Sequence, residues 1–241
     1  MIKQEPSQRE SFQVVELATG NVTKFQKLSQ VKPELAADLI TGIGINNSAS
    51  VSKGDIIGGN STDRALMAFL VDSKVADSLS KEDVRNFNAF DSNKKSSSVT
   101  VTRNGKSVTY IKGAPERIID RCTHYIDENG VEKKLVEKNY LTSYMNEQAG
   151  RSMRLLAVAK CDGVSDEGEL TLICVLSIRD NVRKEAVDAI REVKNAGIQV
   201  VMVTGDRKET AVAIAKEAGL LSNSDDVALT SARWQKRVTK N

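Results

Sequence analysis

The sequence contains few of the residues on which metal and redox sites depend. Among its 241 residues are three cysteines and a single histidine, His124. Cys122, Cys161 and Cys174 are widely spaced, and their spacing indicates neither a metal-binding group nor a redox pair. We expect them to be reduced, buried thiols of a cytoplasmic protein. His124 has no evident partner for catalysis or metal binding, so we interpret it as structural or exposed and predict no metal site.

Long apolar runs and a strong net charge are also missing. The longest apolar run, Leu170–Ile178, is far shorter than the roughly 20 residues of a membrane span, and the N-terminus shows no signal-peptide pattern. A net charge of +3 is too small to indicate nucleic-acid binding. What is present, 40% hydrophobic and 28% charged residues, is typical of a soluble globular protein with one large or two small domains, which we expect to be monomeric.

A β-hairpin is the clearest local structure that the sequence predicts. Alternating apolar and polar residues extend over 99–103 and 106–110, and Asn104-Gly105 separates the two runs. Asn-Gly in this setting is a strong signal for a two-residue hairpin turn. Such a turn pairs Val99 with Tyr110 and places their side chains on one apolar face of the sheet.

Two lysines and an aromatic residue stand near the end of this hairpin. Lys112 is two residues past Tyr110 and falls on the same face; Lys95 does so too if the first strand extends backwards, and Phe90 lies just upstream. The lysines could bury only their stems and keep their ammonium groups in water. Alternatively, the group could bind an anionic ligand with a flat portion, Phe90 stacking on a base. Gly113, the next residue, allows close approach of the backbone.

A helix start is predicted after the two glycines at 58 and 59. Asn60 or Ser61 can cap a helix that runs on through Leu70, and Asp63 then lies in its first turn. Asp63 could simply complement the helix dipole, or it could belong to a binding site at the exit of a strand.

The sequence pattern of residues 198–220 predicts a buried strand, a tight turn and a helix. The apolar run Val200–Val203 ends in Thr204-Gly205-Asp206, and a helical stripe follows. Ligands of parallel α/β sheets bind at the carboxyl ends of strands, where a hydroxyl, a free backbone and the first N–H groups of a helix suit a phosphate. The alternative is that Asp206 only caps the helix, with Glu209 completing a capping box.

The pattern changes near Ser177, from hairpins to alternating strands and helices. An amphipathic helix is predicted over 182–196, whereas the segment before Ser177 contains a buried strand that Arg154 introduces. We therefore predict two domains, residues 1–176 and 177–241, the second ending in a basic tail that we expect to be disordered.

Taken in order, the motifs resemble the cytoplasmic part of a P-type ATPase. Within that family they are most similar to the calcium-pump branch, especially to bacterial calcium-translocating enzymes. The segments at 180–183 and 196–198 resemble those that lead into the phosphorylation domain of that family. The motifs that carry the resemblance are Gly58-Gly59-Asn60-Ser61-Thr62-Asp63-Arg64-Ala65-Leu66, Lys112-Gly113-Ala114-Pro115-Glu116 and Thr204-Gly205-Asp206.

The resemblance implies a fold and a site. Residues 1–176 would form an α+β nucleotide-binding domain, an antiparallel sheet with helices, and residues 177–241 part of an α/β phosphorylation domain of the haloacid-dehalogenase type. ATP would bind to the first domain. The residues matched to the ATP site are Thr62, Asp63, Phe90, Lys95, Lys112, Gly113 and Arg154, and those matched to the phosphoryl site are Thr204, Gly205 and Asp206.

The departures from the family pattern are equally informative. The segment with the phosphorylated aspartate, the magnesium-binding loop and all membrane segments are absent, and no arginine stands near Ser92. We therefore expect an excised fragment without catalytic residues, from a pump at the cytoplasmic face of the plasma membrane. ATP, Mg²⁺ and the remaining phosphorylation, actuator and transmembrane domains would be its partners. A soluble phosphatase of the dehalogenase type and a stand-alone nucleotide-binding module remain as alternatives.

Overall fold

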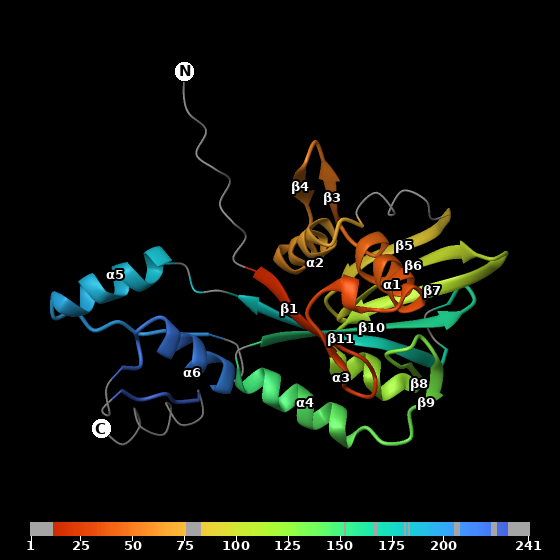
Figure 1. Cartoon of the computed structure of the whole chain (residues 1–241). Coiled ribbons are helices and arrows are strands. Elements are labelled where there is room, and N and C mark those ends of the chain that lie inside the picture. The colour runs from red at the N-terminus through yellow and green to blue at the C-terminus, as the bar shows by residue number, and fades with distance from the viewer. Residues whose placement is uncertain are drawn as a thin grey trace.

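A computed structural model describes residues 12–75, 83–151, 153–165, 168–180, 182, 184–204, 208–222 and 226–230. Its centre is a large, mainly antiparallel sheet of nine strands, seven of which follow one another in the order β2-β1-β11-β10-β7-β6-β5 (Figure 1). These are β1 Phe12–Ala18, β2 Lys24–Phe25, β5 Asp83–Asp91, β6 Ser96–Arg103, β7 Lys106–Gly113, β10 Met153–Asp162 and β11 Leu170–Asp180. This is a mixed α+β fold, as the sequence predicts for its larger part.

The remaining strands lie beside this path or apart from it. β8, Cys122–Ile126, pairs in parallel with β11 and antiparallel with β9, Glu132–Lys134. β3, Ala49–Ser52, and β4, Asp55–Gly58, form a separate hairpin that projects above α2 in Figure 1.

Helices cover both faces of the large sheet (Figure 1). One face carries α1, Pro33–Leu39, the π-helix Ile40–Ile45 that continues it, and α2, Ser61–Asp72; we call it the α2 face. The other carries α3, Pro115–Ile118, and α4, Asn139–Gly150; we call it the α4 face. Short 3₁₀ turns occupy Leu28–Gln30 and Ile119–Arg121. α5, Lys184–Asn195, and α6, Lys208–Glu217, follow β11, and α6 packs against α4.

Alternation along the strands separates the two hydrophobic cores. In β10, Leu156 and Val158 pack with the helices of the α2 face, whereas Ala157 and Ala159 pack with α3 and α4. Successive side chains of a strand point to opposite faces, so even-numbered residues of β10 near this position lie on the α2 face and odd-numbered ones on the α4 face. Residues paired with them on the adjacent strands lie on the same face.

The hairpin was predicted in full detail. Arg103 pairs with Lys106 and Val99 with Tyr110, and Asn104 and Gly105 have φ angles of 52° and 76°. Both central residues of a type I′ turn need positive φ, which is why Asn-Gly selects it. Other confirmed features are the helices at 61–72, 184–195 and 208–217 and the three buried free cysteines.

One local prediction was wrong, and one strand was missed. Val200–Val203 forms no strand, and Val201 and Val203 are 70% and 91% exposed. An isolated extended segment gains no ladder hydrogen bonds, and no strand of the described residues lies beside it. β5 was not predicted at all.

Two further expectations concern the C-terminal segment and the domain boundary. No haloacid-dehalogenase-like sheet is evident in the described part of residues 177–241, which holds α5, α6 and irregular segments. The proposed boundary near Ser177 stays a prediction; β11 continues through this position and pairs with β1 up to Asp180. Among the helices of the described ranges, none is long and apolar enough to cross a membrane.

Candidate functional site

The N-terminus of α2 is held in place by a cap and a close backbone approach. The Asn60 side chain accepts a hydrogen bond from the backbone N–H of Asp63 at 2.9 Å, as expected for an N-cap. Gly59 has φ +67°, and a Cβ there would lie 2.7 Å from the Cβ of Ala49 and 2.9 Å from that of Asp63. This tight turn fixes where Thr62 and Asp63 stand relative to the sheet.

Asp63 forms a buried ion pair with Lys112 of β7. The Lys112 Nζ lies 2.5 Å from Asp63 Oδ1, and both side chains are 6% exposed. Burial lowers the pKa of Lys112, and the Asp63 carboxylate opposes this shift by stabilising the ammonium. Asp63 is therefore more than a complement to the helix dipole, because its carboxylate ties α2 to the end of β7.

Arg154 and Thr62 extend this polar cluster toward solvent. The exposed Arg154 side chain donates from Nη1 to Thr62 Oγ1 at 3.3 Å. Arg154 shares the parity of Leu156 and Val158 and therefore lies on the α2 face. Two cations and a hydroxyl thus stand around the start of α2.

The turn between β5 and β6 brings Lys95 next to the end of β7. The Lys95 carbonyl accepts a hydrogen bond from the N–H of Ala114 at 3.0 Å. A Cβ on Gly113 would lie 2.3 Å from that carbonyl oxygen, so only glycine permits this approach. β6 begins at Ser96, and Lys95 has φ +54°, so the strand does not extend back to Lys95 and the condition on which its placement depended is not met.

Phe90 is 54% exposed and precedes the same turn. The Asp91 carboxylate accepts backbone hydrogen bonds from Asn93 and Lys94, and these bonds lower the pKa of Asp91. Phe90, Lys95, Lys112 and Gly113 therefore come from elements that meet at one end of the sheet, which is the end at which Thr62, Asp63 and Arg154 cluster.

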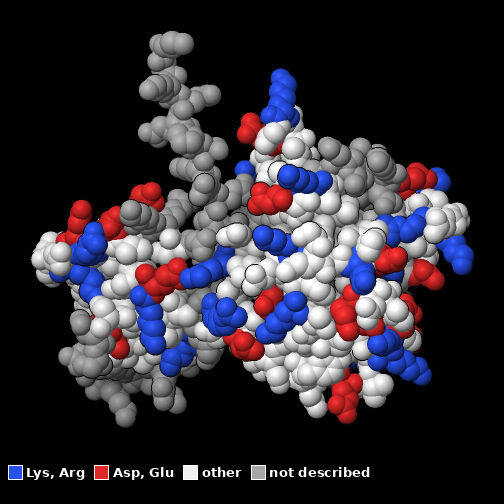
Figure 2. Space-filling model, in the orientation of Figure 1, with Lys and Arg blue, Asp and Glu red and all other residues white. Residues whose placement is uncertain are grey.

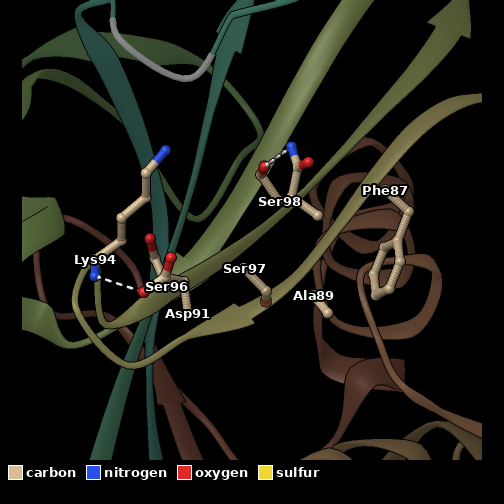
Figure 3. Close-up of a pocket in the computed structure, with 8 residues that line it drawn as sticks. Phe87, Ala89, Asp91, Lys94, Ser96, Ser97 and Ser98 are labelled. Carbon is tan, nitrogen blue, oxygen red and sulfur yellow. Dashed lines mark hydrogen bonds between the residues drawn. The ribbon is translucent and has the colours of Figure 1, made fainter.

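The hairpin β5–β6 also borders a shallow cavity of about 360 Å³ (Figure 3). The sequence had not indicated this cavity. Val84, Phe87 and Phe90 are spaced three residues apart, which does not match the two-residue period of a strand, so the sequence carried no clear signal for the strand along which the cavity lies. The residues lining it are Phe87, Asn88, Ala89, Asp91, Lys94, Ser96, Ser97 and Ser98.

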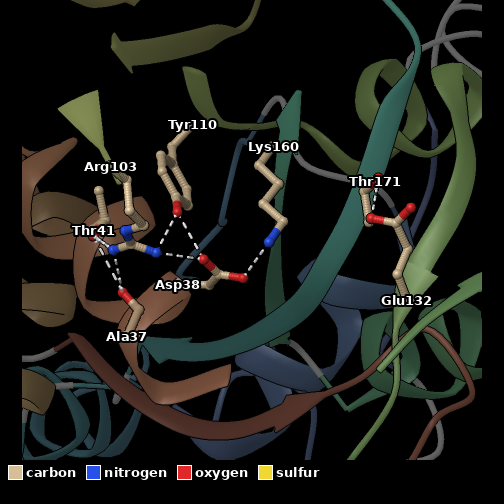
Figure 4. Close-up of polar contacts among 8 residues, drawn as sticks. All are labelled: Ala37, Asp38, Thr41, Arg103, Tyr110, Glu132, Lys160 and Thr171. Carbon is tan, nitrogen blue, oxygen red and sulfur yellow. Dashed lines mark hydrogen bonds and ion pairs between the residues drawn. The ribbon is translucent and has the colours of Figure 1, made fainter. Parts of the chain in front are cut away.

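A second polar cluster is centred on Asp38 (Figure 4). The buried carboxylate of Asp38 in α1 accepts hydrogen bonds from Arg103 at 2.7 Å, from the Tyr110 hydroxyl at 2.7 Å and from Lys160 at 2.6 Å. Partners on three strands, two of them charged, fasten α1 to the α2 face. The cluster holds the sheet and helix in register a few residues from Lys112.

Only one of the three predicted phosphoryl residues lies within the described part of the chain. Thr204 is exposed and lies outside any helix or strand, and Gly205 and Asp206 fall outside the described residues. The capping box that would include Asp206 is therefore not described either. On the molecular face of Figure 2, Lys and Arg side chains are interspersed with Asp and Glu, in keeping with the small net charge.

Comparison with known proteins identifies a protein family that matches this part of the chain. A family model described as the P-type ATPase cytoplasmic domain N matches residues 36–185. This range includes α2, the hairpin, the start of β10 and the whole of the polar cluster around Asp63.

Several complete proteins are similar to the chain. Calcium-transporting ATPase 7, plasma membrane-type, of Oryza sativa subsp. japonica is 36% identical over 212 residues, which are 79% of this chain and 20% of that protein. Plasma membrane calcium-transporting ATPase 4 of Homo sapiens is 33% identical over 202 residues, 76% of this chain and 16% of that protein. The chain therefore spans between about a sixth and a fifth of the length of these relatives.

Proposed function

The chain belongs to the family of P-type ATPase cytoplasmic N domains, and we propose that it is the ATP-binding part of a calcium-transporting pump. The observation that carries this proposal is the convergence of the Asp63–Lys112 pair, Arg154 and the exposed Phe90 at one end of the α2 face. An aromatic ring beside clustered cations suits a base and its phosphates.

Each residue has a role in this proposal. Phe90 stacks on the adenine, while Thr62 and Asp63 meet its polar edge. Lys95 and Lys112 provide positive charge, Arg154 reaches toward the phosphates, and Gly113 lets the lysine-bearing turn approach β7. In this structure the Asp63 carboxylate contacts the Lys112 ammonium. A bound nucleotide therefore has to share this contact or replace it.

Calcium as the transported ion is supported by the names of the relatives, which are calcium-transporting ATPases of plants and animals. The plasma membrane is supported in the same way. A bacterial-type pump remains a prediction from the motifs alone.

Residues 177–241 would belong to a phosphorylation domain completed by other segments of the pump, and Thr204-Gly205-Asp206 would face the transferred phosphoryl group there. The nucleophilic aspartate and the loop for Mg²⁺ would come from those segments. ATP brings the phosphoryl group, and Mg²⁺ would neutralise its developing charge in the intact enzyme.

Calorimetric titration of the isolated chain with ATP tests the proposal. We expect saturable binding that Phe90→Ala weakens by roughly tenfold or more, because stacking on a base contributes about 1–3 kcal/mol. Asp206→Asn should leave the affinity nearly unchanged, because the phosphoryl site is incomplete in this chain. Absence of saturable binding, or equal binding by the Phe90→Ala variant, would contradict the proposal.

A further inference from the structure

The chain between α1 and β3 adopts two unusual backbone conformations in succession. The π-helix Ile40–Ile45 ends at Asn46, whose φ of −76° and ψ of 65° are those of an inverse γ-turn. The turn is closed by the N–H of Asn47, which donates to the Ile45 carbonyl at 2.9 Å. π-Helical turns are rare and are frequently found at functional sites. A rare conformation directly before the β3–β4 hairpin therefore suggests that the segment positions something.

Asn46 holds two neighbouring strands of the large sheet together. Its side chain is fully buried, and its Nδ2 donates to the carbonyls of Ser97 in β6 and Tyr110 in β7 at 3.2 and 3.3 Å. Ser97 pairs with Lys112, which is two residues past Tyr110, so both contacts lie where the sheet presents Lys112. Among the described residues no donor reaches Asn46 Oδ1. An apolar side chain would avoid the cost of this unpaired acceptor, so the two donated bonds are what asparagine supplies here.

Asn47 holds the first turn of α2. Its Nδ2 donates to the carbonyl of Asp63 at 3.0 Å and to that of Ile43 at 2.8 Å, and its Oδ1 accepts from the N–H of Ala49 at 2.7 Å. The N–H of Asp63 is bound by the Asn60 cap. Both polar groups of the Asp63 backbone are therefore held by asparagine side chains, and its carboxylate has a fixed starting point.

The two consecutive asparagines thus connect the two elements that form the Asp63–Lys112 pair. Asn46 fixes β7 close to the lysine, and Asn47 fixes α2 at the aspartate. Because the asparagines are neighbours in the sequence, a single peptide unit joins the two attachments. A buried ion pair is favourable only when its geometry is excellent, so the spacing of α2 and β7 has to be held closely.

We propose that Asn46 and Asn47 are positioning residues for the candidate nucleotide site. They set the separation of α2 and β7, and through it the Asp63–Lys112 contact that a nucleotide shares or replaces. The inference rests on the proposed function where it concerns the nucleotide, whereas its effect on the ion pair is measurable without one. It assigns a role to two residues that lie outside the motifs at 58–66 and 112–116.

Proton exchange of the Lys112 ammonium, followed by NMR without nucleotide, tests the positioning directly. In the wild type the buried ammonium should exchange slowly with water, and Asn46→Ala and Asn47→Ala should each accelerate the exchange several-fold. Asn21→Ala is the matched control, because it removes an exposed side-chain hydrogen bond to Glu128 and should leave Lys112 unchanged. Urea unfolding checks that every variant is folded. Unchanged exchange in both Asn46→Ala and Asn47→Ala would overturn the inference.

A comparison of two backgrounds separates positioning from general support of the fold. Asn46→Ala should weaken ATP binding by roughly fivefold in the wild type, as the loss of hydrogen bonds of ordinary strength would. It should have no effect in a chain that already carries Asp63→Leu and Lys112→Met, since the positioned pair is then absent. Equal weakening in both backgrounds, measured by calorimetry, would show a merely structural role and leave the proposed function standing. If the wild type binds no ATP, the proposed function fails; in that case, or if only the pair-less background loses binding, the exchange rates of Lys112 decide this inference.

Discussion

At the scale of single residues, the Asp63–Lys112 pair has two consequences. Both side chains are almost fully buried, so neither charge is compensated by water. A carboxylate that already contacts the ammonium also competes with any anionic ligand for it. The pair therefore links the stability of the α2 face to the positive charge that nucleotide can use.

Removing the Asp63 charge should destabilise the fold. Asp63→Asn leaves the Lys112 ammonium buried without an anion, and breaking one partner of such a pair costs about 3–5 kcal/mol. Urea unfolding measures this loss. The double variant Asp63→Leu with Lys112→Met is the control and should recover most of the stability. An Asp63→Asn variant as stable as the wild type would show that the pair is absent in solution.

Asp127 provides a pH-dependent contribution in the turn between β8 and β9. The Lys133 ammonium above all, and then the backbone N–H groups of Val131 and Asn129, hold the pKa of Asp127 below its ordinary value of 3.8. A carboxyl whose folded pKa is lowered binds fewer protons folded than unfolded. Its stabilisation is therefore complete above about pH 4 and is lost as the pH falls through the folded pKa.

The variant Asp127→Asn should flatten this dependence. We expect its free energy of unfolding to fall less steeply below pH 4 than that of the wild type, with lower stability at neutral pH. Asp55→Asn, an exposed change in the β3–β4 hairpin, is the matched control. Identical acid profiles for wild type and Asp127→Asn, measured by urea unfolding at several pH values, would refute the assignment.

At the scale of elements, the approach of the β5–β6 turn to β7 depends on Gly113. Gly113→Ala forces its new Cβ against the Lys95 carbonyl, which is backbone and cannot rotate away. We expect a loss of about 1–3 kcal/mol in unfolding free energy, as for other overpacked sites. Gly150→Ala in α4 meets no atom within 4 Å and should be neutral or slightly stabilising. Equal stability of the two variants would contradict the close approach.

How much of each element was predictable follows from where its information lies. The Asn104-Gly105 turn and the Asn60 cap are local, so sequence alone gave the hairpin register and the start of α2. β5 depends on pairing with β6, and its exposed face weakens the apolar alternation. The run Val200–Val203 looks like a core strand, but a strand needs neighbours, which the described chain does not supply there.

The candidate site also contains features that local sequence predicts and features that only tertiary packing creates. The parity argument correctly placed Lys112 on the α2 face, because strand alternation is regular. It could not show that Asp63, 49 residues away, lies against Lys112, since that contact depends on tertiary packing. Nor could it show that the side chain of Ser97 is buried, which only the assembled sheet defines.

At the scale of the whole molecule, the sheet separates two hydrophobic cores and leaves one end of the α2 face as the candidate nucleotide surface. The α4 face carries no counterpart of the Asp63 cluster in the described ranges. A ligand bound as we propose should therefore affect only one side of the molecule.

Titration of the isotope-labelled chain with ATP, followed by NMR, tests this claim most directly. The account predicts saturable shifts at Phe90 and Lys112 on the α2 face, and none at the partly exposed Tyr140 of α4. Shifts confined to the α4 face, or no perturbation at Phe90 and Lys112 at saturating ATP, would contradict it.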